Sequence, residues 1–160
     1  MIVGVVFSTT PQPFKIFKKM IQRMQSIWLI IASALSAAGF WLSFFSGNKL
    51  NTNTQVKEWI EYTAPQNMLI MVVTIAVSVA ALVTVFMYKD RKRQMLVTIV
   101  AALISLVNIA LYFHAKASFV EANLDLGAIL NFAIPLFLML AIRAMYKDEQ
   151  LVKSADRLRD

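Results

Sequence analysis

Residues 68–113 read MLIMVVTIAVSVAALVTVFMYKDRKRQMLVTIVAALISLVNIALYF, which is two uncharged apolar runs joined by a short basic segment. The runs cover residues 68–88 and 95–113, and the joining segment, YKDRKRQ at 88–94, contains four bases among seven residues. An α-helix rises 1.5 Å per residue and needs about 20 apolar residues to cross the hydrocarbon core of a bilayer. Each run therefore predicts a transmembrane helix, and the pair predicts a hairpin whose basic turn lies at the lipid headgroups.

Two further runs extend this pattern to four spans. Residues 27–45 carry no charge, and residues 126–146 carry only Arg143, which is close enough to the helix end to reach the headgroups. The chain is 59% hydrophobic, with a mean hydropathy of +0.64, whereas ordinary soluble domains are about 45–50% apolar. A soluble bundle of four buried helices is the alternative, but it would have almost no polar surface. We therefore predict an all-α membrane protein, a four-transmembrane-helix bundle.

Lysines and arginines are distributed unevenly between the ends of these spans. The loops at residues 46–67 and 114–125 contain only Lys49, Lys57 and Lys116, and the other segments contain all remaining bases. Loops rich in Lys and Arg stay inside, so both termini are expected in the cytoplasm. The bases expected to hold the inner helix ends at the headgroups are Lys89, Arg91, Lys92, Arg93, Arg143 and Lys147.

The segments outside the predicted membrane domain of residues 27–146 are short. Residues 1–26 are expected to be an N-terminal extension, in which residues 13–25 have the pattern of an interfacial helix. The alternative is that residues 1–19 are an upstream extension or a poorly ordered segment. The third loop, at residues 114–125, is expected to be an ordinary solvated loop. In the first loop, helical spacing predicts a short helix on the outer surface from Thr54, Val56, Trp59 and Ile60.

Residues 147–160 continue the helical pattern beyond the membrane as an amphipathic cytoplasmic tail. One interpretation is a helix that docks on a protein partner or on the membrane surface. The other is a solvated tail, because a short free helix is marginal without something to pack against. The candidate docking residues are Leu151, Val152, Arg157, Leu158 and Arg159.

Each span has one stripe of small or polar residues, which predicts close helix packing in lipid. Asn108 and Asn131 lie at matching depths below the outer surface, about 9 Å and 7–8 Å at 1.5 Å per residue, so a hydrogen bond between them is predicted. These amides would either hold helices together or line a small polar pocket open to the outside. The stripes are Ala32, Ser36, Gly39 and Ser43; Thr74, Ser78 and Ala81; Thr98, Ala101, Ser105 and Asn108; and Gly127, Asn131 and Pro135.

The sequence excludes several kinds of chemistry. It contains no cysteine and a single histidine, His114, so disulfides, thiolate catalysis and a multi-histidine metal site within one chain are excluded. It also lacks a glycine-rich phosphate loop and a nucleophile elbow. We therefore predict no enzymatic activity, no cofactor and no metal. Binding of nucleic acid is not expected either, because the basic segment at 88–94 is held between two spans.

Three segments resemble a known family: MIQRMQSIWLIIA at 20–32, YKDRKRQ at 88–94 and AIRAMYKDEQLVKSADRLR at 141–159. Together they are similar to the bacterial domain-of-unknown-function family 4293, a group of small integral membrane proteins. The resemblance covers residues 20–159 and implies a bacterial cytoplasmic membrane, four spans and no assigned catalytic residues. Residues 1–19 depart from the family pattern, which implies a start near Met20.

Two functional hypotheses follow. The first is a non-enzymatic membrane protein that docks a protein partner or anionic lipid through its cytoplasmic face. The second is a small transporter or channel subunit, as a monomer or a homo-oligomer, with a polar intramembrane pocket near Asn108 and Asn131.

Overall fold

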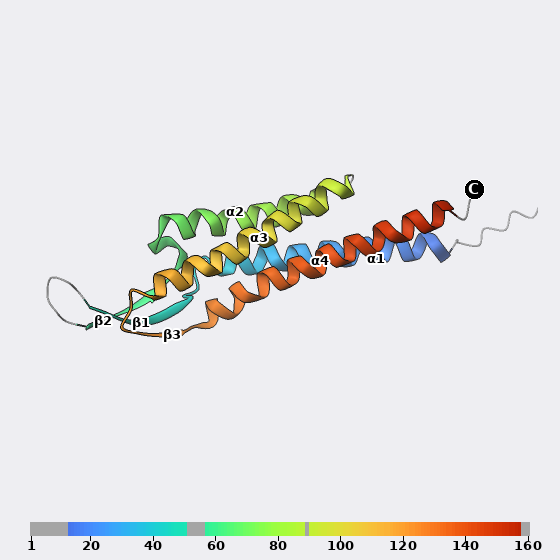
Figure 1. Cartoon of the computed structure of the whole chain (residues 1–160). Coiled ribbons are helices and arrows are strands. Elements are labelled where there is room, and N and C mark those ends of the chain that lie inside the picture. Colours follow the sequence, from blue (N-terminus) through green and yellow to red (C-terminus); the bar gives the residue numbers. More distant parts are fainter. Residues whose placement is uncertain (1–12, 51–56, 89, 158–160) are drawn as a thin grey trace, which may run out of the picture.

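The chain folds into four helices with a small sheet at one end (Figure 1). The structure is a computed structural model, which describes residues 13–50, 57–88 and 90–157. The helices are α1 (Pro13–Ala38), α2 (Met68–Phe86), α3 (Arg91–Lys116) and α4 (Leu126–Arg157). The strands are β1 (Phe45–Leu50), β2 (Lys57–Tyr62) and β3 (Glu121–Leu124), and a 3-10 turn, η1 (Ala64–Gln66), precedes α2.

Consecutive helices run antiparallel, so the bundle has two distinct ends. Helix α1 packs against α2 and α4, and α3 packs against the same two helices. The start of α1 and the end of α4 lie together at the end opposite the sheet, where both helices extend past the α2–α3 turn (Figure 1). We refer to the end that carries β1, β2 and β3 as the sheet end.

Each helix buries one narrow seam whose residues are spaced alternately three and four apart. This average spacing of 3.5 residues is typical of helices that pack side by side over a long contact. Many of the seam residues are small or hydroxyl-bearing, which allows the backbones to approach closely. The buried seams are Gln25, Leu29, Ala32 and Ser36; Ile70, Thr74, Val77, Ala81 and Thr84; Gln94, Thr98, Ala101, Ser105, Asn108 and Tyr112; and Asn131, Ile134, Leu138, Ala141, Met145 and Asp148.

The outward positions of the same helices are more apolar than the seams. On α3, Leu96 is 62% exposed and Leu103, about two turns later, is 59% exposed; Leu136 on α4 is 58% exposed. A soluble protein places such side chains inside. A continuous apolar exterior around polar seams therefore favours a lipid environment.

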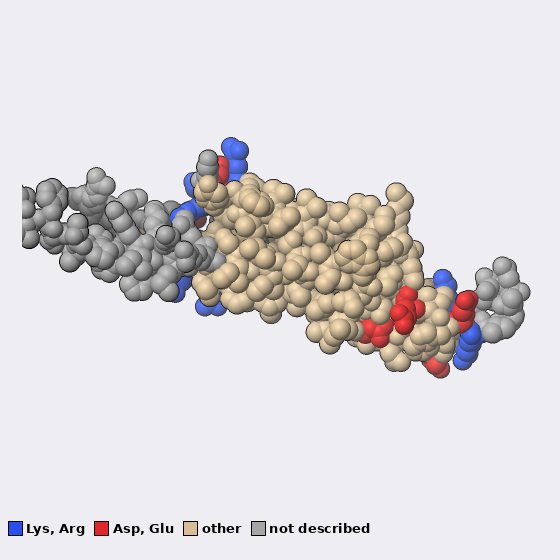
Figure 2. All heavy atoms as spheres, turned by 180° about the vertical axis from the view of Figure 1, so that it is seen from behind, with Lys and Arg blue, Asp and Glu red and all other residues tan. Residues whose placement is uncertain are grey.

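Charged residues gather at the two ends of the molecule and leave the middle of the visible face free of charge (Figure 2). Three described helical stretches are long and apolar enough to cross a membrane: Met68–Phe86, Arg91–Lys116 and Leu126–Leu151. The apolar described part of α1 is shorter, Met24–Ala38. The structure thus has three helices with the dimensions of membrane spans, consistent with a membrane protein.

The first loop contains strands, so the prediction of a short surface helix there was wrong. Residues around Trp59 form β2 in an antiparallel sheet of order β2-β1-β3, and the fold is therefore not purely helical. Thr54 and Val56 lie outside the described residues. The strand is favoured because Tyr62 stacks on Phe45 at 4.8 Å and the ladder satisfies backbone groups. A helix of one or two turns would lack both stabilising contributions.

Helix α1 ends at Ala38, seven residues before the predicted end of the first span at 45. Gly39 follows the last helical residue, as is common at helix ends. Phe44 then packs face to face on Tyr112 of α3, with ring centroids 4.2 Å apart, and Phe45 begins β1. Burial of these aromatic rings under the sheet thus removes the last part of the predicted span from the helix.

The other boundaries differ less from the prediction. Helix α3 extends three residues beyond the predicted 95–113 run to Lys116, and the third loop contains β3 instead of only solvated turns. Helix α4 continues through the predicted tail as far as Arg157, as one uninterrupted helix that includes Pro135. Helix α1 begins at Pro13 and runs through position 26 without a break, and residues 1–12 lie outside the described part of the chain.

Candidate functional site at the basic end of the bundle

A buried ion pair joins α3 to α4 at the end opposite the sheet. Arg91, the first residue of α3, pairs through Nη1 with Oδ2 of Asp148. Asp148 is 2% exposed, although it lies among charged residues in the sequence. It occupies the inward seam of α4, three residues after Met145, which explains its burial. A carboxylate in this position needs a cationic partner, and Arg91 supplies it.

Two glutamines extend this polar contact to the remaining helices. Gln25 of α1 donates its amide to Oε1 of Gln94 of α3 at 3.0 Å, and Gln94 donates to the backbone carbonyl of Thr84 of α2 at 2.9 Å. Gln25, Thr84, Arg91, Gln94 and Asp148 together form what we call the polar layer, in which every helix contributes at least one residue. Side-chain hydrogen bonds between helices stabilise packing where apolar surroundings offer no competing water.

Exposed bases surround the polar layer, and we call this end of the molecule the basic end. Arg93 pairs with Asp90 at 3.0 Å, and both side chains are largely exposed. Lys92, Arg143 and Lys147 are exposed and make no ion pair among the described residues. Of the predicted lipid-anchoring residues, only Lys89 lies outside the described part of the chain. The geometry therefore offers three unpaired cations to negatively charged groups.

The predicted docking residues of the tail are described only in part. Leu151 is 39% exposed on α4. Val152 and Arg157 lie within the helical range of α4, but their side chains are outside the described residues, as are Leu158 and Arg159 altogether.

The two buried asparagines bond to separate partners instead of to each other. Asn108 donates through Nδ2 to Thr74 Oγ1 of α2 at 3.1 Å, whereas Asn131 donates to the carbonyl of Gly127 in its own helix at 2.9 Å. The hydrogen bond predicted between them is therefore replaced by one α2–α3 bond and one local bond. Asn108 Oδ1 and the hydroxyl of Tyr112, one turn further along α3, are buried and meet no hydrogen-bond partner of good geometry among the described residues.

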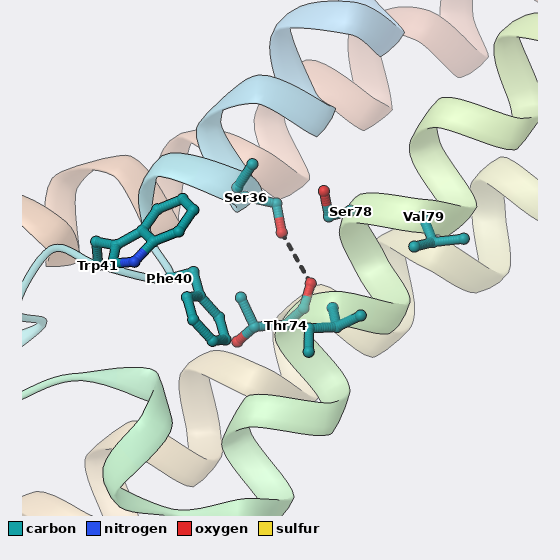
Figure 3. Close-up of a pocket in the computed structure, with 8 residues that line it drawn as sticks. Ser36, Phe40, Trp41, Thr74, Ser78 and Val79 are labelled. Carbon is teal, nitrogen blue, oxygen red and sulfur yellow. Dashed lines mark hydrogen bonds between the residues drawn. The ribbon is translucent and has the colours of Figure 1, made fainter.

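An apolar groove lies between α1 and α2 (Figure 3). It has a volume of about 250 Å³ and opens to the exterior of the bundle. Neither Asn108 nor Asn131 lines this groove, although Asn108 donates to Thr74, which does. Its lining consists of Ser36, Ala37, Phe40, Trp41, Thr74, Ile75, Ser78 and Val79.

The described residues offer binding chemistry at the surface. Within residues 13–50, 57–88 and 90–157, no group of three His, Asp or Glu side chains is placed to hold a metal ion. The polar layer is internally paired, and the unpaired cations around it are suited to phosphate or carboxylate groups.

A comparison with family models matches residues 21–158 to the family described as Domain of unknown function (DUF4293). This match covers most of the chain. The protein is a member of the DUF4293 family. No curated protein and no solved structure shows significant similarity to it.

The three segments that resemble the DUF4293 family are distant in sequence but meet in the polar layer. Gln25 belongs to the segment at 20–32, Arg91 and Gln94 to the segment at 88–94, and Asp148 to the segment at 141–159. The fold thus brings these segments together at one end of the bundle, and this makes the basic end the candidate functional site.

Sequence reasoning identified the bases at this end but missed the polar layer. The residues beside Asp148, Lys147 and Glu149, are charged and by themselves indicate an exposed position. The seam spacing of Leu138, Ala141 and Met145 was the signal that could have placed Asp148 inside. Gln25 and Gln94 belong to corresponding seams on α1 and α3.

Replacement of Asn108 by leucine is expected to destabilise the bundle by about 0.6–2 kcal/mol, because the α2–α3 hydrogen bond to Thr74 is lost. Unfolding of the detergent-solubilised protein by SDS, followed by tryptophan fluorescence, measures this change. Val107→Leu is the matched control, since Val107 is the adjacent residue and is 55% exposed. Equal stability of the two variants would show that the Asn108 bond does not hold α2 to α3.

Proposed function

We propose that this DUF4293 protein is a non-enzymatic, four-span protein of the bacterial inner membrane that binds anionic lipid headgroups through its basic end. The observation that supports this most directly is the arrangement of charge. A middle without charged residues separates two charged ends on the visible face (Figure 2), and at one of them Lys92, Arg143 and Lys147 are exposed and make no ion pair among the described residues. Bases next to the membrane attract anionic lipids.

The fourth span in this proposal is α1. The helix has 26 residues, about 39 Å at 1.5 Å per residue, and it packs along both α2 and α4 as a full member of the bundle. Its described apolar part, Met24–Ala38, is followed by the mainly apolar residues 39–44 before β1 begins at Phe45.

The distribution of bases supports a cytoplasmic position for the basic end. The sheet end carries Lys49, Lys57 and Lys116, and every other lysine and arginine belongs to segments that lead to the opposite end. By the positive-inside rule this orientation places both termini in the cytoplasm. The tail of α4 then projects from the basic end, where it is the segment best placed to contact a protein partner or a second copy.

Neutralising the three unpaired bases is expected to remove bound anionic lipid. Each base near an anionic leaflet contributes about 1 kcal/mol, so Lys92→Gln/Arg143→Gln/Lys147→Gln should weaken retention of phosphatidylglycerol at least about tenfold. Native mass spectrometry of the protein released from nanodiscs of phosphatidylglycerol and phosphatidylethanolamine measures the retained lipid.

The matched control removes the same number of charges from the sheet end, in Lys49→Gln/Lys57→Gln/Lys116→Gln. This control changes net charge equally, so a general electrostatic effect would reduce retention in both variants. Equal retention by the two triple variants would contradict specific binding at the basic end.

A second candidate function is a small transporter or channel subunit. The observation that favours it is that the buried Asn108 Oδ1 and Tyr112 hydroxyl have no hydrogen-bond partner within the described part of the chain, since polar groups that face a solute path need free hydrogen-bonding capacity. Proteoliposomes that show no ion or solute flux above lipid-only vesicles would count against this function.

A further inference from the structure

The α1–α2 groove lies at a depth where hydrocarbon, and not water, surrounds the protein. It extends along α2 from Thr74 to Val79, six to eleven residues after the start of the helix at Met68. At 1.5 Å per residue this range is about 9–17 Å below the sheet end of the helix. That depth corresponds to the acyl-chain region of the leaflet on the sheet side. This statement rests on the proposed function, because it requires α1 and α2 to cross the membrane.

The hydroxyl groups of the groove are already bonded inside the protein. Ser36 donates through Oγ to the carbonyl of Thr74 at 3.1 Å, and this bond is the dashed line in Figure 3. Ser78 donates to the carbonyl of Ser33 at 3.3 Å, and Thr74 donates to the carbonyl of Ile70 at 2.8 Å. A polar ligand would find few free donors here, so the groove is suited to an apolar occupant.

The groove exists because α1 ends while α2 continues beside it. After Ala38 the chain leaves the helical path, and the rings of Phe40 and Trp41 meet edge to face at 5.4 Å and close one end of the groove (Figure 3). Ile75 and Val79 of α2 line it and are exposed to the exterior. An apolar cavity of about 150 Å³ already binds benzene, so 250 Å³ accommodates a segment of hydrocarbon chain.

We propose that the α1–α2 groove binds one acyl chain of a phospholipid from the leaflet on the sheet side. Trp41 is 76% exposed at the end of the groove nearest that membrane surface. Tryptophan prefers this interfacial depth, where its ring contacts hydrocarbon and its N–H reaches polar headgroups. The acyl chain therefore lies along Ala37, Ile75 and Val79, with the glycerol end of the lipid near Trp41.

The test uses the fluorescence of Trp41 in vesicles of phosphatidylglycerol with dibrominated acyl chains, because bromine quenches tryptophan on contact. Trp28→Phe/Trp59→Phe leaves Trp41 as the single tryptophan of the chain, which has three. Phenylalanine at Ala37 would fill the groove. We expect Ala37→Phe to reduce quenching of Trp41 at least about twofold, because the acyl chain of the lipid loses its close contacts with the groove walls.

Ala34→Phe is the matched control, since Ala34 is an exposed alanine of α1, one turn earlier, that does not line the groove. Equal quenching of Trp41 in Ala37→Phe and Ala34→Phe would overturn the proposal. A groove filled by a second copy would shield Trp41 from brominated lipid and give a dimer in native mass spectrometry, which would overturn it as well.

A third protein separates failure of this site from failure of the proposed function. In Trp28→Phe/Trp41→Phe/Trp59→Phe/Leu103→Trp, the single tryptophan lies on the outward face of α3, where Leu103 is 59% exposed. Quenching at position 103 with none at Trp41 would show a membrane-embedded protein without the groove site. Absence of quenching at both positions would contradict the membrane topology itself and the groove with it.

Discussion

Replacement of Arg91 by methionine is expected to reduce the free energy of unfolding by about 3–5 kcal/mol, the usual cost of leaving a buried charge without its partner. Asp148 is 2% exposed and pairs with Arg91, whose side chain is 27% exposed. Methionine keeps an unbranched apolar stem and removes the guanidinium group, and with it the ion pair to Asp148. SDS-induced unfolding followed by tryptophan fluorescence measures the loss.

Two further variants make this prediction specific. Arg93→Met removes an exposed arginine two residues away, whose pair with Asp90 is exposed, so a loss below about 1 kcal/mol is expected. Arg91→Met/Asp148→Leu removes both members of the buried pair and should recover most of the stability, because no unpaired charge remains. A loss of similar size in Arg91→Met and Arg93→Met would show that Asp148 is not buried against Arg91 in the membrane.

The helical part of the fold was predictable because its signal is local. An uncharged run of about 20 residues has few alternatives to a buried or membrane-spanning helix, and the run at 68–88 corresponds to α2 within two residues. The small and polar stripes also indicated which face turns inward, since Thr98, Ala101, Ser105 and Asn108 are all buried.

The sheet was missed because its stability depends on partners that are distant in sequence. Trp59 and Ile60 of KEWIEY lie at helical spacing from Val56, and this local pattern favoured a helix. The observed strand depends instead on the stack of Tyr62 on Phe45 and on the pairing of β1 with β3, more than 70 residues away. No local pattern in the first loop indicates that the third loop provides a strand. The same dependence shortened α1, because Phe44 packs on Tyr112 of α3.

The candidate site was predictable in its charge but not in its geometry. The composition of the segment at 88–94 predicts exposed bases, and Lys92 and Arg93 are exposed. The neighbouring Arg91 turns toward α4 and becomes part of the polar layer. Which base of a cluster is exposed and which is buried depends on the helix start at Arg91 and on the facing seam, and both are properties of the packed bundle.

The polar layer and the groove divide the molecule into two regions with different physical roles. Hydrogen bonds and an ion pair link the four helices at the basic end, so this end is held by interactions with strict geometry. Near the sheet end, α1 and α2 flank an apolar groove whose hydroxyl groups are already bonded within the protein. The cations at the basic end are therefore expected to select anionic lipid headgroups, whereas the groove is expected to select acyl chains that pack well against its walls.

Gly47 provides the second large effect, because it lies in the central strand β1 between Ile60 of β2 and Ala122 of β3. A Cβ atom at this position would overlap the carbonyl oxygen of Glu121 and lie 2.8 Å from the Cα of Ala122. Both neighbours are backbone atoms and cannot rotate away. Gly47→Ala should therefore cost about 3 kcal/mol, the upper end of the usual range for overpacking, with β3 displaced from β1.

The same substitution at Gly39 is the control, because there the nearest atoms to the added Cβ are the amide nitrogen of Asn131 at 3.2 Å and the carbonyl oxygen of Leu35 at 3.3 Å. These neighbours need to move by only a few tenths of an ångström, unlike the overlapping atoms at Gly47, so Gly39→Ala should cost below about 1 kcal/mol. Hydrogen exchange separates the two sites, since loss of protection in β1 and β3 with α3 unchanged indicates release of the sheet alone. If Gly47→Ala were as stable as Gly39→Ala, with protection in β3 retained, the close approach of β1 to β3 would be contradicted. In that case the packing of Phe44 on Tyr112 would be stabilised from the sheet by β2 alone, through the stack of Tyr62 on Phe45.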